Sequence, residues 1–247
     1  MNKYLRTNIL LEDDQFVFIN KEPGLLSIPD RFDSEKVNLK SMLRQQFGDI
    51  YTVHRLDLDT SGVIVFAKNA KAHADLSSLW QENKVHKKYV AITSNIPLSV
   101  SGTIDAPLRE HKTKRGTYTV SDLGKESKTD YEVVQSWNSS YALLELVLHS
   151  GRTHQIRVHL AYIGCPLMVD PTYGYQSKFF LSSIKKKKVN LGKGMTERPL
   201  LKRTPLHASS LKFKLPKGKS YEVKSELPKD IKAIKYQLDK RYGEPSS

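Results

Sequence analysis

One acidic residue has surroundings that suit chemistry. Asp57 lies in the segment His54–Gly62, shortly before an apolar run that starts at Val63. A carboxylate at a junction between a loop and a strand can face a cleft while the scaffold behind it stays rigid. When ionised, it can attack an electrophilic carbon or move a proton without a cofactor. The alternative for a lone aspartate is a turn or capping role, and this is the role that we expect for Asp59.

A second segment could supply the positive charge that such a carboxylate needs. Gly151–Leu160 contains Arg152 and Arg157. A guanidinium beside a poorly solvated carboxylate favours its charged form and fixes its orientation. The alternative is a surface arginine that binds phosphate, and Arg152 fits this alternative, or a structural role, better than Arg157 does. We expect Thr153 to cap the helix that follows.

The histidines do not form a metal motif. His149, His154 and His159 are five residues apart. On a helix His154 and His159 therefore point in different directions, whereas zinc-binding pairs usually lie four residues apart. The sequence also contains no phosphate-binding P-loop, no dinucleotide fingerprint and no serine elbow. We expect no metal site and no cofactor.

The elements that must position these residues are mostly strands. Apolar or alternating runs predict strands over 15–19, 62–67, 88–92, 131–134, 142–148, 206–213 and 220–223. Helical spacing predicts helices over 37–47, 70–82, 153–163 and 230–241. Strands and helices do not alternate strictly, which argues against a doubly wound sheet. We predict an α+β fold with a mixed, largely antiparallel central sheet and flanking helices.

The charge balance indicates a polyanionic partner. Lysine and arginine number 40 against 26 acidic residues, a net charge of +14. Nucleic acid is the commonest partner of such a protein, although a basic, well-solvated surface is the alternative. The single cysteine, Cys165, rules out an internal disulfide. No apolar run reaches the roughly 18 residues of a membrane span, and we find no signal peptide, so we expect a cytoplasmic protein without membrane contact.

Two polar segments are rich in basic residues. The first, 109–124, contains Lys112, Lys114 and Arg115, and the second, 177–203, contains the run Lys185, Lys186, Lys187 and Lys188. We expect 177–203 to be a flexible basic insertion. Its alternatives, which are compatible with each other, are a solvated loop and a mobile arm that ranges over phosphates.

Four segments in order resemble the RluA-type RNA pseudouridine synthases. These segments are 20–27, 54–62, 87–91 and 151–160, the last followed by 170–174. The second resembles the family's catalytic motif His-Arg-Leu-Asp-x-x-Thr-Ser-Gly. The fourth resembles its Gly-Arg-x-His-Gln-Ile/Leu-Arg-Val-His segment. The likeness covers roughly Leu11 to Tyr221. Within the family, the chain resembles the short members, such as ribosomal large-subunit pseudouridine synthase A. It implies the pseudouridine synthase fold around a catalytic cleft.

The resemblance also implies roles for individual residues. Asp57 would start the conversion of uridine to pseudouridine, by addition to the base, by attack on the ribose or by proton removal. Arg157 would keep Asp57 ionised. Tyr89 would lie against the target base and assist proton removal from its C5 carbon, although a core tyrosine is the alternative. Arg55 would fill the space left by the flipped uridine, and the alternative is a salt bridge.

The organisation departs from the family pattern in two places. Glu22 stands where the first segment usually has proline, and Pro23 follows it. Only about twenty residues precede this segment, which is too few for the S4-type RNA-binding domain of larger relatives. We therefore expect a single catalytic domain over 1–247, acting as a monomer on ribosomal RNA of the large subunit, on tRNA or on both. The alternative function is a non-catalytic RNA-binding factor in ribosome assembly.

Overall fold

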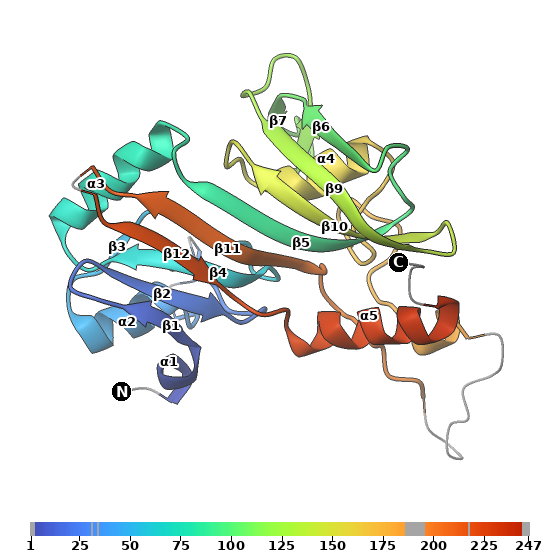
Figure 1. Ribbon diagram of the computed structural model, residues 1–247, viewed down its shortest axis with the longest axis horizontal. Coiled ribbons are helices and arrows are strands. Elements are labelled where there is room, and N and C mark those ends of the chain that lie inside the picture. Colours follow the sequence, from blue (N-terminus) through green and yellow to red (C-terminus); the bar gives the residue numbers. More distant parts are fainter. Residues whose placement is uncertain (1–2, 31, 34, 186–195, 217, 244–247) are drawn as a thin grey trace. The chain divides into compact units, whose positions relative to one another are not determined.

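The computed structural model describes residues 3–243 except 31, 34, 186–195 and 217. The chain forms two compact units. The first contains Met1–Tyr89 and His207–Glu226, and the second contains Val90–Leu206 and Leu227–Ser247. Figure 1 shows the helices and strands of both units.

The first unit is built on a mixed sheet. Its strands follow the order β1 (Ile9–Glu12), β2 (Phe16–Lys21), β4 (Ser61–Ala67) and β11 (Leu206–Lys214), with β12 (Ser220–Lys224) beside β11 and β3 (Tyr51–Thr52) beside β4. Strands β4 and β11 pair in parallel, whereas β2 pairs with β4 in antiparallel register. The helices of this unit are α1 (Lys3–Asn8), α2 (Leu39–Phe47) and α3 (Ala70–Gln81).

Aromatic side chains form the centre of the first unit's core. Phe16, Phe18, Phe213 and Tyr221 are buried, and their ring centroids lie 5.0 to 6.2 Å apart. Edge-to-face and offset contacts at these distances add to the free energy gained from burying the rings. The helix α3 completes this core with Ala72, Leu76 and Leu79 on one face, as the helical spacing predicts.

The second unit combines a sheet, a hairpin and two helices. Strand β5 (His86–Ser94) enters it from the first unit and is followed in the sheet by β10 (Tyr141–Leu148), β9 (Lys128–Trp137) and β6 (Ser101–Asp105). Strands β7 (Leu108–Glu110) and β8 (Tyr118–Val120) form the separate hairpin. The helices are α4 (Gln155–Tyr162), α5 (Lys229–Tyr242) and a short 3₁₀ turn (Leu181–Ser183).

Helix α5 is attached to the second unit by apolar and polar contacts. Ile231, Ile234 and Leu238 are fully buried in its core. Asp239 on the same helix accepts hydrogen bonds from Trp137 Nε1 at 2.9 Å and from Gln135 Nε2 at 2.6 Å. The polar groups of these buried or partly buried side chains are therefore satisfied where the helix meets β9.

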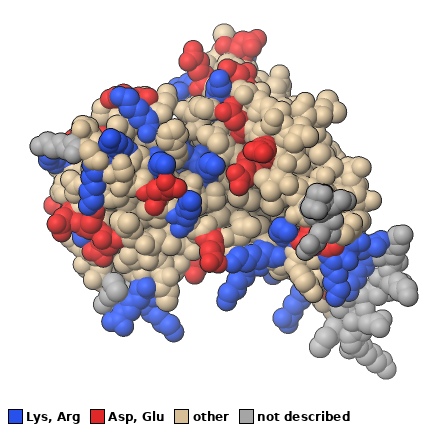
Figure 2. All heavy atoms as spheres, in the orientation of Figure 1, with Lys and Arg blue, Asp and Glu red and all other residues tan. Residues whose placement is uncertain are grey.

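The predicted α+β class and the largely antiparallel sheet are confirmed, and so are the longer predicted elements. The expectation that Thr153 caps α4 is wrong. The N-cap is His154, in a left-handed conformation with φ of 56°, and its side chain makes no capping hydrogen bond. No helix in the described part of the chain is long and apolar enough to cross a membrane. Figure 2 shows basic and acidic side chains interspersed over much of one face, with basic side chains more frequent at its lower right.

Candidate active site

Asp57 lies in the loop between β3 and β4. Its side chain is partly exposed, while the neighbouring Leu56 is buried and Leu58 is exposed. The backbone N–H of Thr60 donates to the carbonyl of Asp57 at 3.1 Å and closes a tight turn just before β4. The loop therefore presents the carboxylate from a backbone that is fixed by the strand behind it.

Ser27 holds the residue before Asp57. Its hydroxyl donates to the carbonyl of Leu56 at 2.8 Å and accepts from the N–H of Leu56 at 3.1 Å. Ser27 is 3 % exposed, so water does not compete for these bonds. Both backbone polar groups of Leu56 are thus satisfied by one side chain, which fixes the direction in which Asp57 leaves the backbone.

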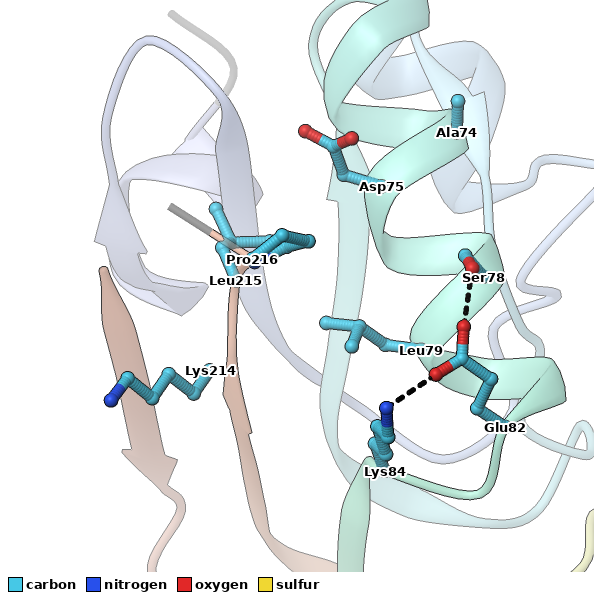
Figure 3. A pocket seen from close by; sticks show the side chains of 9 residues that line it. All are labelled: Ala74, Asp75, Ser78, Leu79, Glu82, Lys84, Lys214, Leu215 and Pro216. Carbon is cyan, nitrogen blue, oxygen red and sulfur yellow. Dashed lines mark hydrogen bonds and ion pairs between the residues drawn. The ribbon is translucent and has the colours of Figure 1, made fainter. Parts of the chain in front are cut away.

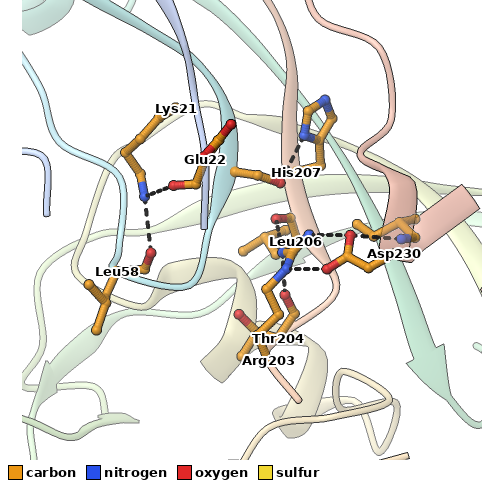
Figure 4. A network of polar contacts seen from close by, with 10 residues as sticks. Lys21, Glu22, Leu58, Arg203, Thr204, Leu206, His207 and Asp230 are labelled. Atoms are coloured by element: carbon orange, nitrogen blue, oxygen red, sulfur yellow. Dashed lines mark hydrogen bonds and ion pairs between the residues drawn. The ribbon is translucent and has the colours of Figure 1, made fainter. Parts of the chain in front are cut away.

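Lys21 and Gly24 hold the residue after Asp57. The Nζ of Lys21 donates to the carbonyls of Leu25 at 2.8 Å, Leu58 at 3.0 Å and Glu22 at 3.1 Å (Figure 4). The N–H of Gly24 also donates to the carbonyl of Leu58, at 2.9 Å. Gly24 adopts φ of 80°, which favours glycine. Segment 20–27 therefore holds the Asp57 loop from both sides.

Strand β4 is fixed against β11 at the end of the same loop. Gly62 has φ of 111°, and a Cβ atom added there would lie 2.2 Å from the carbonyl oxygen of Ala208. Only glycine permits this approach of the two backbones. Beside it, the hydroxyl of Ser61 bonds to Nδ1 of the buried His207 at 3.0 Å. These contacts set where β4 begins and hence where the turn after Asp57 ends.

Tyr89 belongs to the same unit as Asp57 and is electrostatically coupled to it. Its side chain is 9 % exposed. Burial, and then the negative charge of Asp57, raise the pKa of Tyr89 well above its ordinary value. The phenol therefore stays neutral at physiological pH.

His54 and Lys87 both contact the ring of Trp80. The ring of His54 lies 4.4 Å from that of Trp80, and Lys87 Nζ lies 5.3 Å from the Trp80 ring. The N–H of Val65 donates to Nε2 of His54 at 3.2 Å. Burial and the charge of Lys87 lower the pKa of His54 to about 3, and burial lowers the pKa of Lys87 to about 8. His54 is therefore neutral at physiological pH and can accept the hydrogen bond from Val65.

Arg157 lies on α4 in the second unit and is 9 % exposed. Its Nε and Nη2 donate to the carboxylate of Asp170 at 2.7 and 2.8 Å. Its guanidinium lies 4.9 Å from the ring centre of Tyr173. Burial opposes ionisation of Asp170, but the bonds and charge of Arg157 outweigh it, so the pKa of Asp170 is lowered. That Arg157 acts on Asp57 stays a prediction.

The other predicted contact residues are largely exposed. Arg55 and Arg152 lie on the surface, and Arg152 Nε donates to the carbonyl of Glu126 at 3.1 Å. Lys185 is also exposed. Lys186, Lys187 and Lys188 lie outside the described residues, so the role of the basic run stays a prediction.

The β7–β8 hairpin carries a basic groove. A cavity of about 350 Å³ lies between its strands and the adjoining loop. Its lining combines basic side chains with hydroxyl groups: Arg109, His111, Lys112, Thr119, Val120 and Ser121. Lys114 and Arg115 are exposed at the tip of the same hairpin. Cations and hydroxyls arranged in this way suit phosphate oxygens.

A second groove has a different character. It measures about 490 Å³ and lies between α3 and the end of β11 (Figure 3). One of its two acidic residues, Glu82, accepts from the hydroxyl of Ser78 at 2.7 Å and pairs with Lys84 at 2.6 Å. The charges of Glu82 and Lys84 therefore compensate each other within the groove.

The three histidines have separate partners. His149 bonds to Asp130, His154 to Tyr173, and His159 to Thr129 and the carbonyl of Ala106. Among the residues described, no three histidine, cysteine or acidic side chains come together as metal ligands would.

Several residues that contact the Asp57 loop or Arg157 had no role in our sequence predictions. They are Lys21, Ser27, Asp170 and Tyr173. All four lie inside the segments that resemble the family, which was the only signal available. Their contacts join residues that are distant in sequence, so spacing alone does not predict them.

Comparisons with known proteins identify the family. The model of the family described as RNA pseudouridylate synthase matches residues 15–162. The chain is 33% identical to "Ribosomal large subunit pseudouridine synthase D" of Haemophilus ducreyi, over 96% of this chain and 73% of that protein. It is 34% identical to "Dual-specificity RNA pseudouridine synthase RluA" of Vibrio vulnificus, over 86% and 79%.

A solved structure shows the same fold. It is described as "Human RNA Pseudouridylate Synthase Domain Containing 4" and superposes with a TM-score of 0.71 at 27% identity, covering 96% of this chain and 94% of that chain. The matched region contains Asp57 and Tyr89 and extends through Arg157. The chain therefore belongs to the RNA pseudouridine synthase family, in its RluA-type branch, and is an isomerase that converts uridine to pseudouridine in RNA.

Proposed function

We propose that the protein modifies specific uridines in ribosomal RNA of the large subunit, in tRNA, or in both. The names of the relatives from Haemophilus ducreyi and Vibrio vulnificus support this proposal, since one specifies the large subunit and the other a dual specificity. The net charge of +14 agrees with a large polyanionic substrate.

Asp57 is the proposed catalytic residue. The observation that carries this proposal is the support of its loop, in which Ser27 holds Leu56 while Lys21 and Gly24 hold Leu58. A reacting group must be kept within a fraction of an ångström of its productive position, and such bonds provide that order in advance. The partly exposed carboxylate can then meet a uridine that has left its stack.

Tyr89 and Arg157 are the proposed partners of Asp57. The neutral phenol of Tyr89 offers an aromatic face to the base and a hydroxyl that can donate a hydrogen bond. Its raised pKa argues against a free phenolate as the base that removes the C5 proton. Arg157 is proposed to stabilise the charge of Asp57, as the resemblance implies. Its bonds to Asp170 hold the guanidinium in a defined orientation.

The proposed RNA contacts are of two kinds. Arg55, which is exposed two residues before Asp57, would occupy the space of the flipped uridine. Arg152, the basic run 185–188 and the groove of the β7–β8 hairpin would contact phosphates. We further propose one catalytic domain that acts as a monomer in the cytoplasm.

The substrate can be tested directly. The protein is incubated with transcripts of large-subunit ribosomal RNA and with unmodified tRNA, and pseudouridine is mapped at single-nucleotide resolution. The same mapping is made on cellular RNA with and without the gene. We expect at least one uridine in one of these RNAs to be converted in both assays. Absence of conversion in both RNAs would contradict the proposed substrate class.

A further inference from the structure

A continuous set of contacts in the second unit joins the basic hairpin to Arg157. Tyr173 lies at its centre. The backbone N–H of Tyr118, in β8, donates to the hydroxyl of Tyr173 at 2.8 Å. The same hydroxyl bonds to Nδ1 of His154 at 2.9 Å. Because a phenol can accept one bond and donate another, Tyr173 can satisfy both neighbours when His154 is neutral with its proton on Nε2.

The ring of Tyr173 contacts the guanidinium of Arg157, and one carboxylate organises both. The guanidinium lies 4.9 Å from the ring centre. Asp170 accepts from Arg157 through both oxygens, and its Oδ1 also accepts from the backbone N–H groups of Thr172 and Tyr173 at 2.9 and 3.0 Å. The turn that places the Tyr173 ring and the orientation of Arg157 therefore depend on the same anion.

His154 connects the set to the start of α4. It has φ of 56°, which is uncommon for a residue other than glycine and costs free energy. Its ring makes edge contacts with Tyr118 at 5.9 Å and with Tyr173 at 5.6 Å. The hydrogen bond to Tyr173 thus fixes the side chain of His154 at the start of α4. Arg157 follows three residues later in this helix.

Tyr173 is not a core residue. It is only partly buried and does not belong to the apolar clusters described for either unit. Its contacts are instead polar or cationic, and they join β8, α4 and the turn at 170–173. A tyrosine that only stabilises the fold would more often bury its ring among apolar side chains.

We propose that Tyr173 is a positioning residue that couples the basic β7–β8 hairpin to Arg157. Phosphates bound at Arg109 and Lys112 would fix the position of the hairpin. The hydrogen bond from Tyr118 would then fix the hydroxyl of Tyr173, and the ring of Tyr173 would orient the guanidinium of Arg157. RNA binding would in this way align Arg157. The inference rests on the proposed role of Arg157 in catalysis.

The first test separates the hydroxyl from the ring. Tyr173→Phe removes the two hydrogen bonds of the hydroxyl and keeps the aromatic ring beside Arg157. Tyr173→Leu removes the hydrogen bonds and the aromatic ring. Tyr175→Phe is the matched control, because Tyr175 is 70% exposed. At saturating RNA, we expect the single-turnover rate constant to fall about 10-fold in Tyr173→Phe and further in Tyr173→Leu, with RNA affinity and thermal stability of Tyr173→Phe nearly unchanged. The control should match the wild type.

The second test addresses the coupling. Lys112→Ala should lower the rate at saturating RNA in the wild type but add little in the Tyr173→Phe background, since the link is already broken. The NMR signal of the Arg157 Nε–H should shift in Tyr173→Phe and stay in place in Tyr175→Phe. Provided that the wild type is active, either of two results would overturn the inference. One is a Tyr173→Phe variant with an unchanged single-turnover rate constant and an unchanged Arg157 signal. The other is that the rate losses of Lys112→Ala and Tyr173→Phe are fully additive. An inactive wild type would instead contradict the proposed function.

Discussion

At the scale of single residues, the site depends on groups that hold Asp57 without being adjacent to it in sequence. Ser27 uses one hydroxyl to satisfy both backbone groups of Leu56, and Lys21 places a buried ammonium on the carbonyl of Leu58. A buried ammonium requires several hydrogen-bond acceptors, and three carbonyls supply them here. The position of the carboxylate thus results from segment 20–27 as much as from its own loop.

Ser27→Ala should therefore affect both stability and catalysis. The substitution leaves the buried N–H and carbonyl of Leu56 without their partner, which should lower the free energy of unfolding by about 1–3 kcal/mol. Displacement of Asp57 should lower the single-turnover rate constant by about 10-fold or more. Urea denaturation and single-turnover assays measure the two effects. The exposed Ser41→Ala is the control, and equal behaviour of the two variants would contradict the role of Ser27.

His54 should make the folded state sensitive to acid. Its pKa is lowered to about 3, so between pH 6.5 and 3 the unfolded chain binds a proton that the folded chain does not. Stability should thus fall with decreasing pH by up to about 1.4 kcal/mol per unit from this group. His54→Gln should give a less stable protein at pH 7 with a flatter decline from pH 6.5 to 4.5, measured by urea denaturation. The exposed His86→Gln should keep the wild-type slope. A slope that is the same in all three proteins would refute this expectation.

At the scale of elements, the approach of β4 to β11 decides where the catalytic loop ends. These strands pair in parallel although they are far apart in sequence, and Gly62 permits the contact with Ala208. The hydrogen bond between Ser61 and His207 joins the same two strands. A change at this junction should therefore reach the turn that contains Asp57.

Gly62→Ala tests this junction. The added Cβ atom would have to lie 2.2 Å from a backbone oxygen, and the residue would also adopt an unfavourable φ of 111°. Gly48→Ala is the matched control, because it has φ of 76° and open space around the new methyl group. We expect Gly62→Ala to lose about 1–3 kcal/mol more than Gly48→Ala in the free energy of unfolding, and to lose activity as well. Equal losses of unfolding free energy in the two variants would contradict the claim that stability depends on the close approach of β4 and β11 at Gly62.

The long elements could be predicted from sequence, and the short ones could not. Runs such as 61–67 and helices such as 70–81 contain enough periods to identify their type. Strands β3, β7 and β8 have two or three residues and no period to detect. Within the site, Asp57, Tyr89 and Arg157 were predicted through motif segments. The bonds between Lys21 and Leu58, 37 residues apart, depend on the tertiary fold, as does the ion pair of Arg157 with Asp170.

At the scale of the whole molecule, the excess of basic residues concerns RNA affinity more than the chemical step. Lysine and arginine exceed the acidic residues by 14, and side chains of both signs occur, unevenly distributed, on the face that Figure 2 shows. Specific basic segments, and not a uniform surface, should therefore supply the phosphate contacts. The candidates are the β7–β8 hairpin and the run 185–188.

Neutralising these segments should weaken RNA binding and flatten its dependence on salt. Two variants are compared, one with Lys112, Lys114 and Arg115 changed to Ala, and one with Lys185 to Lys188 changed to Ala. Each lost phosphate contact should reduce the slope of log K against log salt by about 0.7–0.9. The control changes Lys71, Lys212 and Lys224, which pair with acidic side chains, to Gln. If a basic-segment variant keeps the wild-type slope, that segment is a solvated loop.

The most direct measurement of the central claim is tritium release from RNA that carries [5-³H]uridine. Asp57→Asn keeps the shape of the side chain and removes its charge, and Asp59→Asn is the control two residues away in the same turn. We expect release by Asp57→Asn to fall at least about 1,000-fold while RNA affinity persists, and Asp59→Asn to retain most of its activity. Release by Asp57→Asn at a rate near that of the wild type would contradict the role of Asp57 in the reaction.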